Sequence, residues 1–142
     1  MAKHELIIYG DPKAQGRPRA TNKGRFATVY EDKKDKQAKA NLAVVVQQKA
    51  PEQLLSGPLR VDLSFYFHRP KAHFGTGRNA GTLKLSAPTH YTSKPDRDNL
   101  DKLVLDALTG IFWLDDSQVC DGRIIKQYSS RPRTEITIEE LS

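Results

Sequence analysis

The chain has 142 residues, with 23 Lys and Arg against 17 Asp and Glu, which gives a formal charge of +6 at pH 7. This length predicts one domain, 1–142, whose core is large enough to need neither a disulfide nor a structural metal. The single Cys120 excludes an internal disulfide and predicts a reducing, cytoplasmic location. No apolar run approaches the roughly 20 residues that cross a membrane, and the N-terminal one is too short for a signal peptide.

The first third of the chain predicts a strand, a loop and a helix. Residues 4–9 contain an apolar run bounded by glycine and proline, which is typical of a strand. Residues 11–27 are rich in glycine, proline and basic side chains, and this composition predicts a loop. Residues 30–48 predict a helix with an apolar second half, and Pro51 stands just after its end.

The middle of the chain predicts a strand, a long loop and a second helix. Residues 59–68 alternate between apolar and polar side chains, the period of a half-buried strand. Residues 69–95 have no sustained period, so we expect a flexible, basic binding loop, the alternative being an insertion without a role. Residues 99–109 have the apolar spacing of a helix, with Asp98 expected as N-cap and Gly110 as the left-handed C-terminal residue.

Two more apolar stretches complete the chain. Residues 118–128 and 133–138 are predicted to form a closing antiparallel pair of strands. The resulting order β-α-β-α-β-β predicts an α/β (α+β) fold, in which two main helices cover a small mixed sheet.

Charge is distributed unevenly along the sequence. Residues 11–25 have a net charge of +4 and residues 67–95 a net charge of +5, whereas residues 96–121, with seven aspartates, have a net charge of −5. This distribution favours a polyanionic partner held near a divalent cation, although two solvated loops would also account for the basic segments. The candidate residues for binding such a polyanion are Arg17, Arg19, Lys23, Arg25, Arg69, Lys71, Arg78, Lys84 and Lys94.

The aspartates have the spacing of a metal site for Mg²⁺ or Mn²⁺. Asp96 and Asp98 are two residues apart, so on an extended segment their carboxylates project to the same side at the start of the predicted helix. The helix and an extended return after it are each roughly 16 Å long, which would bring Asp115 or Asp116 close to this pair. The pattern does not decide between these two residues. Lys102, one turn after Asp98, would place a cation beside a bound phosphate.

The same aspartates could also have purely structural roles. Asp98 alone is a plausible helix cap and 115–117 a simple turn, but a cap does not require Asp96 as well. The spacing after Asp96 does not fit a calcium EF-hand, because Leu100 and Asp101 occupy the positions of a ligand and the required glycine. The sequence contains no zinc-ligand spacing, phosphate-binding P-loop or G-x-S-x-G motif.

The motif K-P-D-x-D-N-L-x-K over 94–102, with D-D-S-Q-V over 115–119, resembles the RusA family of Holliday-junction resolvases from bacteria, prophages and phages. A G-R-P-R run over 16–19 is a weaker likeness. The resemblance implies a RusA-like, homodimeric endonuclease, dependent on Mg²⁺ or Mn²⁺, that resolves four-way DNA junctions by paired symmetric cuts. Residues 92–95 differ from the arginine-rich run that precedes the first catalytic aspartate in the best-known member.

Carried over by position, the catalytic and metal-binding aspartates are Asp96, Asp98 and Asp116, with Asp115 as a further possible ligand and Lys102 as the family's lysine. Two symmetric cuts call for two sites related by symmetry, and residues 44–46 or 111–113 are candidates for the apolar dimer surface. Two other functions stay open at this point. One is a non-catalytic DNA-binding module, and the other is a metal-dependent nuclease or phosphatase acting on linear DNA, flaps or nucleotides.

Overall fold

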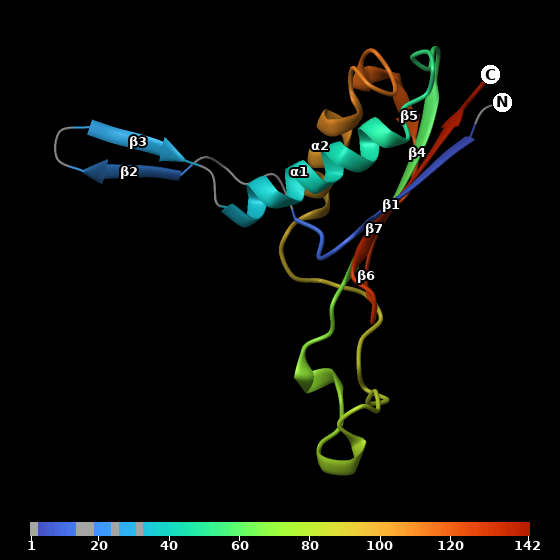
Figure 1. Cartoon of the computed structure of the whole chain (residues 1–142). Coiled ribbons are helices and arrows are strands. Elements are labelled where there is room, and N and C mark those ends of the chain that lie inside the picture. The colour runs from blue at the N-terminus through green and yellow to red at the C-terminus, as the bar shows by residue number, and fades with distance from the viewer. Residues whose placement is uncertain (1–2, 14–18, 24–25, 31–32) are drawn as a thin grey trace.

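The computed structural model describes residues 3–13, 19–23, 26–30 and 33–142, with side chains for 3–13 and 39–142. It confirms a mixed sheet covered by two helices, and it adds a separate two-stranded hairpin (Figure 1). None of the helices in these ranges combines the length and the apolar character needed to cross a membrane.

Strand β4 (Leu59–Phe67) is the centre of the sheet, because it is hydrogen-bonded to strands on both sides. Every second side chain of β4 is buried, as the period-two pattern predicted. On one side lies antiparallel β7 (Arg133–Glu140), which pairs in turn with β1 (Lys3–Tyr9). On the other side, β5 (Val119–Asp121) and β6 (Ile124–Tyr128) run parallel to β4.

The predicted antiparallel pairing of residues 118–128 with 133–138 is wrong. Strand β6 pairs with β4, and β7 is inserted between β4 and β1. The three buried side chains of β7, Thr134, Ile136 and Ile138, face the core in alternation, which suits a strand with neighbours on both sides. The segment between β4 and β6 contains a helix, and such a crossover allows parallel pairing.

The single strand expected over 118–128 is divided at Gly122. This residue has a φ of +146°, and a Cβ built on it would lie 1.9 Å from the Val61 carbonyl oxygen. The chain therefore passes too close to β4 for any residue with a side chain. Beyond the break, Leu63 N donates to the Arg123 carbonyl (2.8 Å) and the ladder continues with β6.

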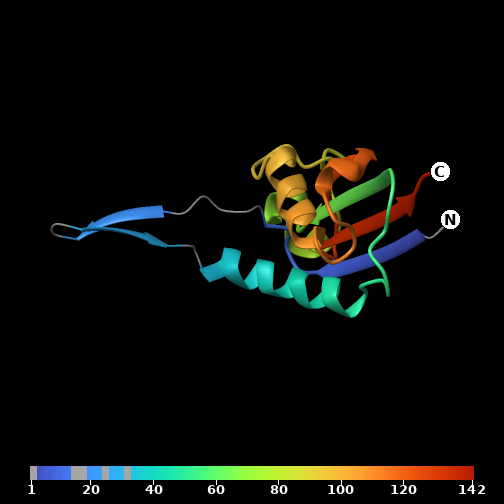
Figure 2. The same ribbon diagram turned by 90° about the horizontal axis from the view of Figure 1, so that it is seen from above.

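Two helices cover one face of the sheet (Figures 1 and 2). Helix α1 (Lys33–Gln48) buries Leu42 and Val46 against the sheet. It begins later than the Tyr30 expected from sequence, because Tyr30 belongs to a strand. Helix α2 (Arg97–Leu108) buries an apolar stripe of four residues, Leu100, Leu103, Val104 and Leu108.

The predicted loop over 11–27 is wrong for its second half. Strand β2 (Arg19–Lys23) pairs with β3 (Phe26–Tyr30) in an antiparallel hairpin, with Arg19 opposite Tyr30 and Lys23 opposite Phe26. The run F-A-T-V-Y has aromatic and β-branched residues that favour strands, and this preference outweighs the glycines and prolines nearby. The hairpin lies apart from the sheet (Figures 1 and 2).

The apolar segments considered for a dimer surface are mostly internal. Phe112, Trp113 and Val46 have no exposed surface and belong to the core that α1, α2 and the sheet enclose. Val44 is the exposed member of residues 44–46. Burial of the aromatic pair removes residues 112 and 113 from the possible interface, since an interface residue must be accessible before association.

Between β4 and α2 the chain forms a projection that we call the arm, residues 68–92 (Figure 1). The absence of regular structure expected for 69–95 is only partly correct. The arm has two short 3₁₀ turns, η1 (Lys71–His73) and η2 (Gly77–Asn79), and an antiparallel bridge between Phe74 and Leu83.

Candidate active site

The start of helix α2 presents two carboxylates to solvent. Asp96, not Asp98, occupies the N-cap position, with extended backbone angles of φ −70° and ψ 150°. The prediction of Asp98 as the cap is therefore wrong, and Asp98 lies in the first turn. The Asp96 side chain makes no capping hydrogen bond, and neither carboxylate is paired with a described side chain. Both residues are exposed, so both carboxylates are available to a ligand.

The segment that leads into Asp96 is held by hydrogen bonds from the sheet side. Tyr91 Oη donates to the Lys94 carbonyl (2.5 Å), and Lys126 Nζ donates to the Ser93 carbonyl (2.8 Å). Lys126 Nζ also lies 5.2 Å from the centre of the Tyr91 ring, a cation–π contact. These bonds fix the backbone two and three residues before Asp96, and they originate from the arm and from β6.

The end of helix α2 agrees with the sequence prediction, but the chain that follows the helix does not. Gly110 has a φ of +89°, the left-handed conformation expected after a helix. The extended return along 111–115 is wrong, because Gly110 N donates to the Trp113 carbonyl (2.6 Å) in a tight turn. Trp113 Nε1 then donates to Thr109 Oγ1 (3.1 Å), which satisfies the buried indole.

Asp115 has a structural role at the next turn, η3 (Asp116–Gln118). Its Oδ1 accepts from Ser117 N (2.9 Å), while Gln118 Oε1 accepts from Asp115 N (3.0 Å), which together form a capping box. The hydrogen bond from the Ser117 amide lowers the pKa of the Asp115 carboxyl. Gln118 Nε2 also donates to the carbonyls of Leu55 and Gly57 (3.1 Å each), which ties η3 to the chain before β4.

The negative charge of Asp116 acts on a carboxyl group of helix α2. Burial raises the pKa of the Asp101 carboxyl, the Arg97 guanidinium lowers it, and the negative charge of Asp116 raises it again. Asp101, one turn after Asp98, is half-buried, whereas Asp116 is exposed. Sequence reasoning missed Asp101 as a member of this acidic surface, although its spacing of three residues from Asp98 places it on the same side of the helix.

The structure does not assemble these carboxylates into a finished metal centre. Within residues 3–13, 19–23, 26–30 and 33–142, no three His, Cys, Asp or Glu side chains are grouped so that they could hold a metal ion. Asp96 and Asp98 lie at the start of α2, and Asp116 lies within electrostatic reach of Asp101. Lys102 is exposed on the same helix. Asp115 is engaged with its own turn.

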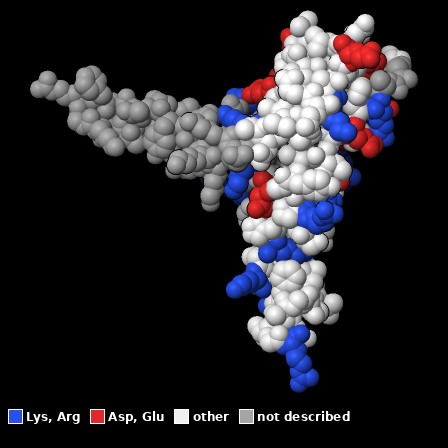
Figure 3. All heavy atoms as spheres, in the orientation of Figure 1, with Lys and Arg blue, Asp and Glu red and all other residues white. Residues whose placement is uncertain are grey.

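The candidate DNA-binding residues fall into three groups. Arg17 and Arg25 lie outside the described residues, and Arg19 and Lys23 lie in β2, where only the backbone is described. Arg69 is engaged within the arm, since its Nη1 donates to the Pro88 carbonyl (2.7 Å). The exposed cations of the arm and its exit are Lys71, Arg78, Lys84 and Lys94. Lys and Arg side chains follow the length of the arm (Figure 3).

Comparison with known proteins gives two kinds of match. A family model described as "Endodeoxyribonuclease RusA" matches residues 9–139. An uncharacterized protein of Bacillus subtilis, YqaN, is 37% identical over 138 residues, which cover 97% of this chain and 96% of YqaN. The crossover junction endodeoxyribonucleases RusA of Escherichia coli K12 and of Enterobacteria phage 82 are 50% identical over 48 residues, which cover 32% of this chain and 40% of each relative.

Proposed function

The chain belongs to the RusA family of endodeoxyribonucleases, hydrolases of DNA phosphodiester bonds, and from this premise we propose that it resolves four-way DNA junctions with the help of a divalent metal ion. The observation that carries the proposal is the pair of exposed carboxylates of Asp96 and Asp98, neither of them paired with a described side chain, in a chain that also has a basic arm. If these aspartates served only to cap the helix, we would expect a carboxylate to accept a backbone N–H at the helix N-terminus.

The donor chemistry at the start of α2 fits a hard cation. Asp96 and Asp98 provide carboxylate oxygens, the ligands that Mg²⁺ and Mn²⁺ prefer, and we propose Asp116 as the third ligand. The capping box of Asp115 supports this choice, because its carboxylate already accepts the Ser117 amide. A bound ion of this kind supplies Lewis-acid polarisation of a phosphate and lowers the pKa of a bound water.

Other residues then bind and orient the DNA. Lys102 lies one turn after Asp98 and would offset negative charge on the phosphoryl oxygens in the transition state. Exposed lysines and arginines of the arm would contact backbone phosphates, which supplies affinity that does not depend on base sequence. We further propose a homodimer, since paired symmetric cuts across a two-fold junction require two sites related by symmetry.

The proposal is tested with a synthetic four-way junction, compared with linear and flap DNA, each with and without Mg²⁺. Paired symmetric nicks confined to the junction and to samples with metal are expected. Nicking of linear DNA at the same rate would contradict junction selectivity, and nicking without any divalent ion would contradict the role of the metal. Asp96→Asn should bind the junction as well as the unmodified chain does but should not cut it.

Neighbouring aspartates provide a matched pair of variants for the third ligand. Asp116→Asn should lower the nicking rate by more than ~100-fold, since removing even an outer-shell partner of a metal ligand costs about 10- to 100-fold. Asp115→Asn makes the same chemical change but keeps a side-chain oxygen for the cap, because Asn and Asp cap about equally well. It should retain most of the activity, and the reverse result would assign the ligand to Asp115.

A further inference from the structure

Backbone hydrogen bonds pair the two legs of the arm with each other and with β6. Lys84 N donates to the His73 carbonyl (2.9 Å) and Gly75 N to the Thr82 carbonyl (3.0 Å), on either side of the Phe74–Leu83 bridge. Farther along, Tyr128 N donates to the Thr89 carbonyl (2.9 Å) and Tyr91 N to the Lys126 carbonyl (3.0 Å), so the returning leg pairs with β6. The arm is therefore a paired extension of the sheet.

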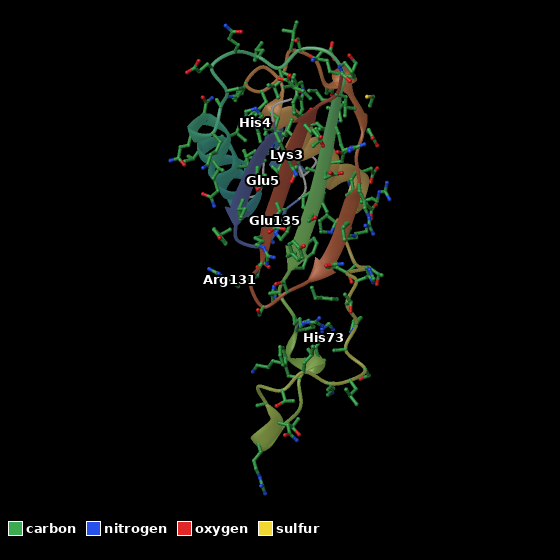
Figure 4. All side chains as sticks on the ribbon, turned by 90° about the vertical axis from the view of Figure 1, so that its right-hand side faces the viewer. Lys3, His4, Glu5, His73, Arg131 and Glu135 are labelled. Atoms are coloured by element: carbon green, nitrogen blue, oxygen red, sulfur yellow. The ribbon has the colours of Figure 1, made fainter. Side chains whose placement is uncertain are left out.

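A group of aromatic rings fixes the direction of the arm at its base, near the labelled His73 (Figure 4). The Tyr91 ring is stacked on the Phe67 ring, with 3.8 Å between the ring centroids. The Tyr128 ring forms T-shaped contacts with Tyr91 and His73, with centroid distances of 5.2 and 4.6 Å. Arg69 lies over the Tyr128 ring (5.3 Å) and is bonded to the Pro88 carbonyl, which connects the two legs. These contacts come from β4, the arm and β6, so the arm cannot pivot without breaking them.

The surface of the arm combines positive charge with exposed leucine. Residues 69–95 contain no acidic side chain, and Leu85 follows Lys84 directly. Leu85 is fully exposed, with a relative exposure of 108%, the largest of any bulky apolar side chain in the described part of the chain, and Leu83 is 44% exposed. A single exposed leucine is ordinary. An exposed leucine on a projection that carries basic but no acidic side chains has the composition of the apolar wedges that proteins insert between base steps of DNA.

We propose that the arm is a wedge that inserts Leu85, supported by Leu83, between bases at the branch point of its DNA substrate. This inference rests on the proposed function for the branched DNA itself. Insertion is favoured at a branch point, because stacking is already interrupted there and less unstacking is required. Tyr91, at the base of the arm, is bonded to the carbonyl of Lys94, two residues before Asp96. The wedge therefore sets the distance between the branch point and the cutting site.

The test uses a four-way junction with the fluorescent base 2-aminopurine at the branch point, mixed with protein without divalent metal so that no strand is cut. The protein variants are Leu85→Ser, Lys84→Gln and a matched control, Ile7→Ser. Ile7 is an exposed apolar side chain as well, with the same 44% exposure as Leu83, but it lies in β1, which β7 and β4 separate from β6 and the arm. Unstacking raises 2-aminopurine fluorescence, so the unmodified chain and Ile7→Ser should raise it equally.

Leu85→Ser should reduce this rise about tenfold and slow junction nicking with Mg²⁺ to a similar degree, because the polar side chain no longer replaces the lost stacking. Its junction affinity should keep the same salt dependence. Lys84→Gln should do the opposite, keeping the fluorescence rise while lowering the salt slope of binding by about one. This contrast separates insertion from attraction to phosphates.

Equal fluorescence and nicking for Leu85→Ser and Ile7→Ser would overturn the wedge while leaving the nuclease proposal intact. A change in the oligomeric state of Leu85→Ser on size-exclusion chromatography would also overturn it, because the leucine would then contact a second copy. A Leu85-dependent fluorescence rise without nicking under any metal would support the wedge and contradict the proposed function. If the unmodified chain neither binds the junction nor raises fluorescence, both proposals fail.

Discussion

Gly122→Ala tests how closely the returning chain passes β4. A Cβ at this position would lie 1.9 Å from the Val61 carbonyl oxygen and 2.7 Å from its carbonyl carbon. Val61 is in the central strand and is paired with Ile138, so it cannot retreat without disturbing the sheet. We expect a loss of about 2–5 kcal/mol in the free energy of unfolding, from about 1–3 for overpacking and about 1–2 for the unusual backbone conformation.

Gly10→Ala is the matched control for this substitution. Gly10 also has a positive φ, +115°, but a Cβ built on it meets no atom within 4 Å. It should lose only the backbone part, about 1–2 kcal/mol, so the difference between the two variants measures the steric clash. Urea unfolding can be followed by the fluorescence of Trp113, the sole tryptophan, which is fully buried. Equal losses for the two variants would refute the close approach.

Two further predictions concern the candidate active site. Asp101→Asn should stabilise the fold at neutral pH and flatten its pH dependence. The pKa of Asp101 is raised above its ordinary 3.8, so the folded state holds the proton more tightly and stability declines as pH rises through the folded pKa. Urea unfolding at several pH values from about 4 to 7 measures this, and an unchanged slope would contradict the burial of the carboxyl. Tyr91→Phe removes the bond to the Lys94 carbonyl but keeps the stacked ring, so the nicking rate should fall several-fold at unchanged junction affinity, with stability lowered by about 1 kcal/mol. Tyr128→Phe is the control, since its hydroxyl makes no bond to the described residues, and equal nicking by both variants would remove Tyr91 from the positioning of Asp96.

Local patterns predicted the elements whose burial follows one period. The alternation of β4 and the apolar stripe of α2 can be read from neighbouring residues alone, and so can Gly110 after the helix. The pairing partner of β6 could not be predicted from neighbouring residues. Strand β7 lies between β4 and β1, which leaves the other edge of β4 to β6, and no short stretch of sequence specifies this order. The break between β5 and β6 at Gly122 was also not predictable, because it depends on a close approach to Val61 that no local pattern specifies.

The candidate site was predicted in its residue types but not in its arrangement. Spacing predicted Asp96 and Asp98 as candidates, but the cap was assigned to the wrong one of them, because both have the same side chain and the helix begins earlier than expected. The capping box of Asp115 and Gln118 was readable, since an acceptor followed three residues later by Gln is its sequence signature. The effect of Asp116 on Asp101 depends on the folded turn and had no signal in the sequence.

The separation of charge along the chain has a physical consequence for how such an enzyme would bind DNA. In the proposed mechanism the carboxylates at the start of α2 would approach phosphates that repel them, and at physiological salt charges act over only about 8 Å. Attraction must therefore come from cations that contact the DNA themselves, and the arm presents Lys71, Arg78 and Lys84 without one acidic neighbour in 69–95. The bond from Tyr91 to Lys94 connects the base of the arm, and with it the attractive surface, to the segment before Asp96. Binding energy gained on the arm can then hold the acidic centre against a phosphate that it would otherwise avoid.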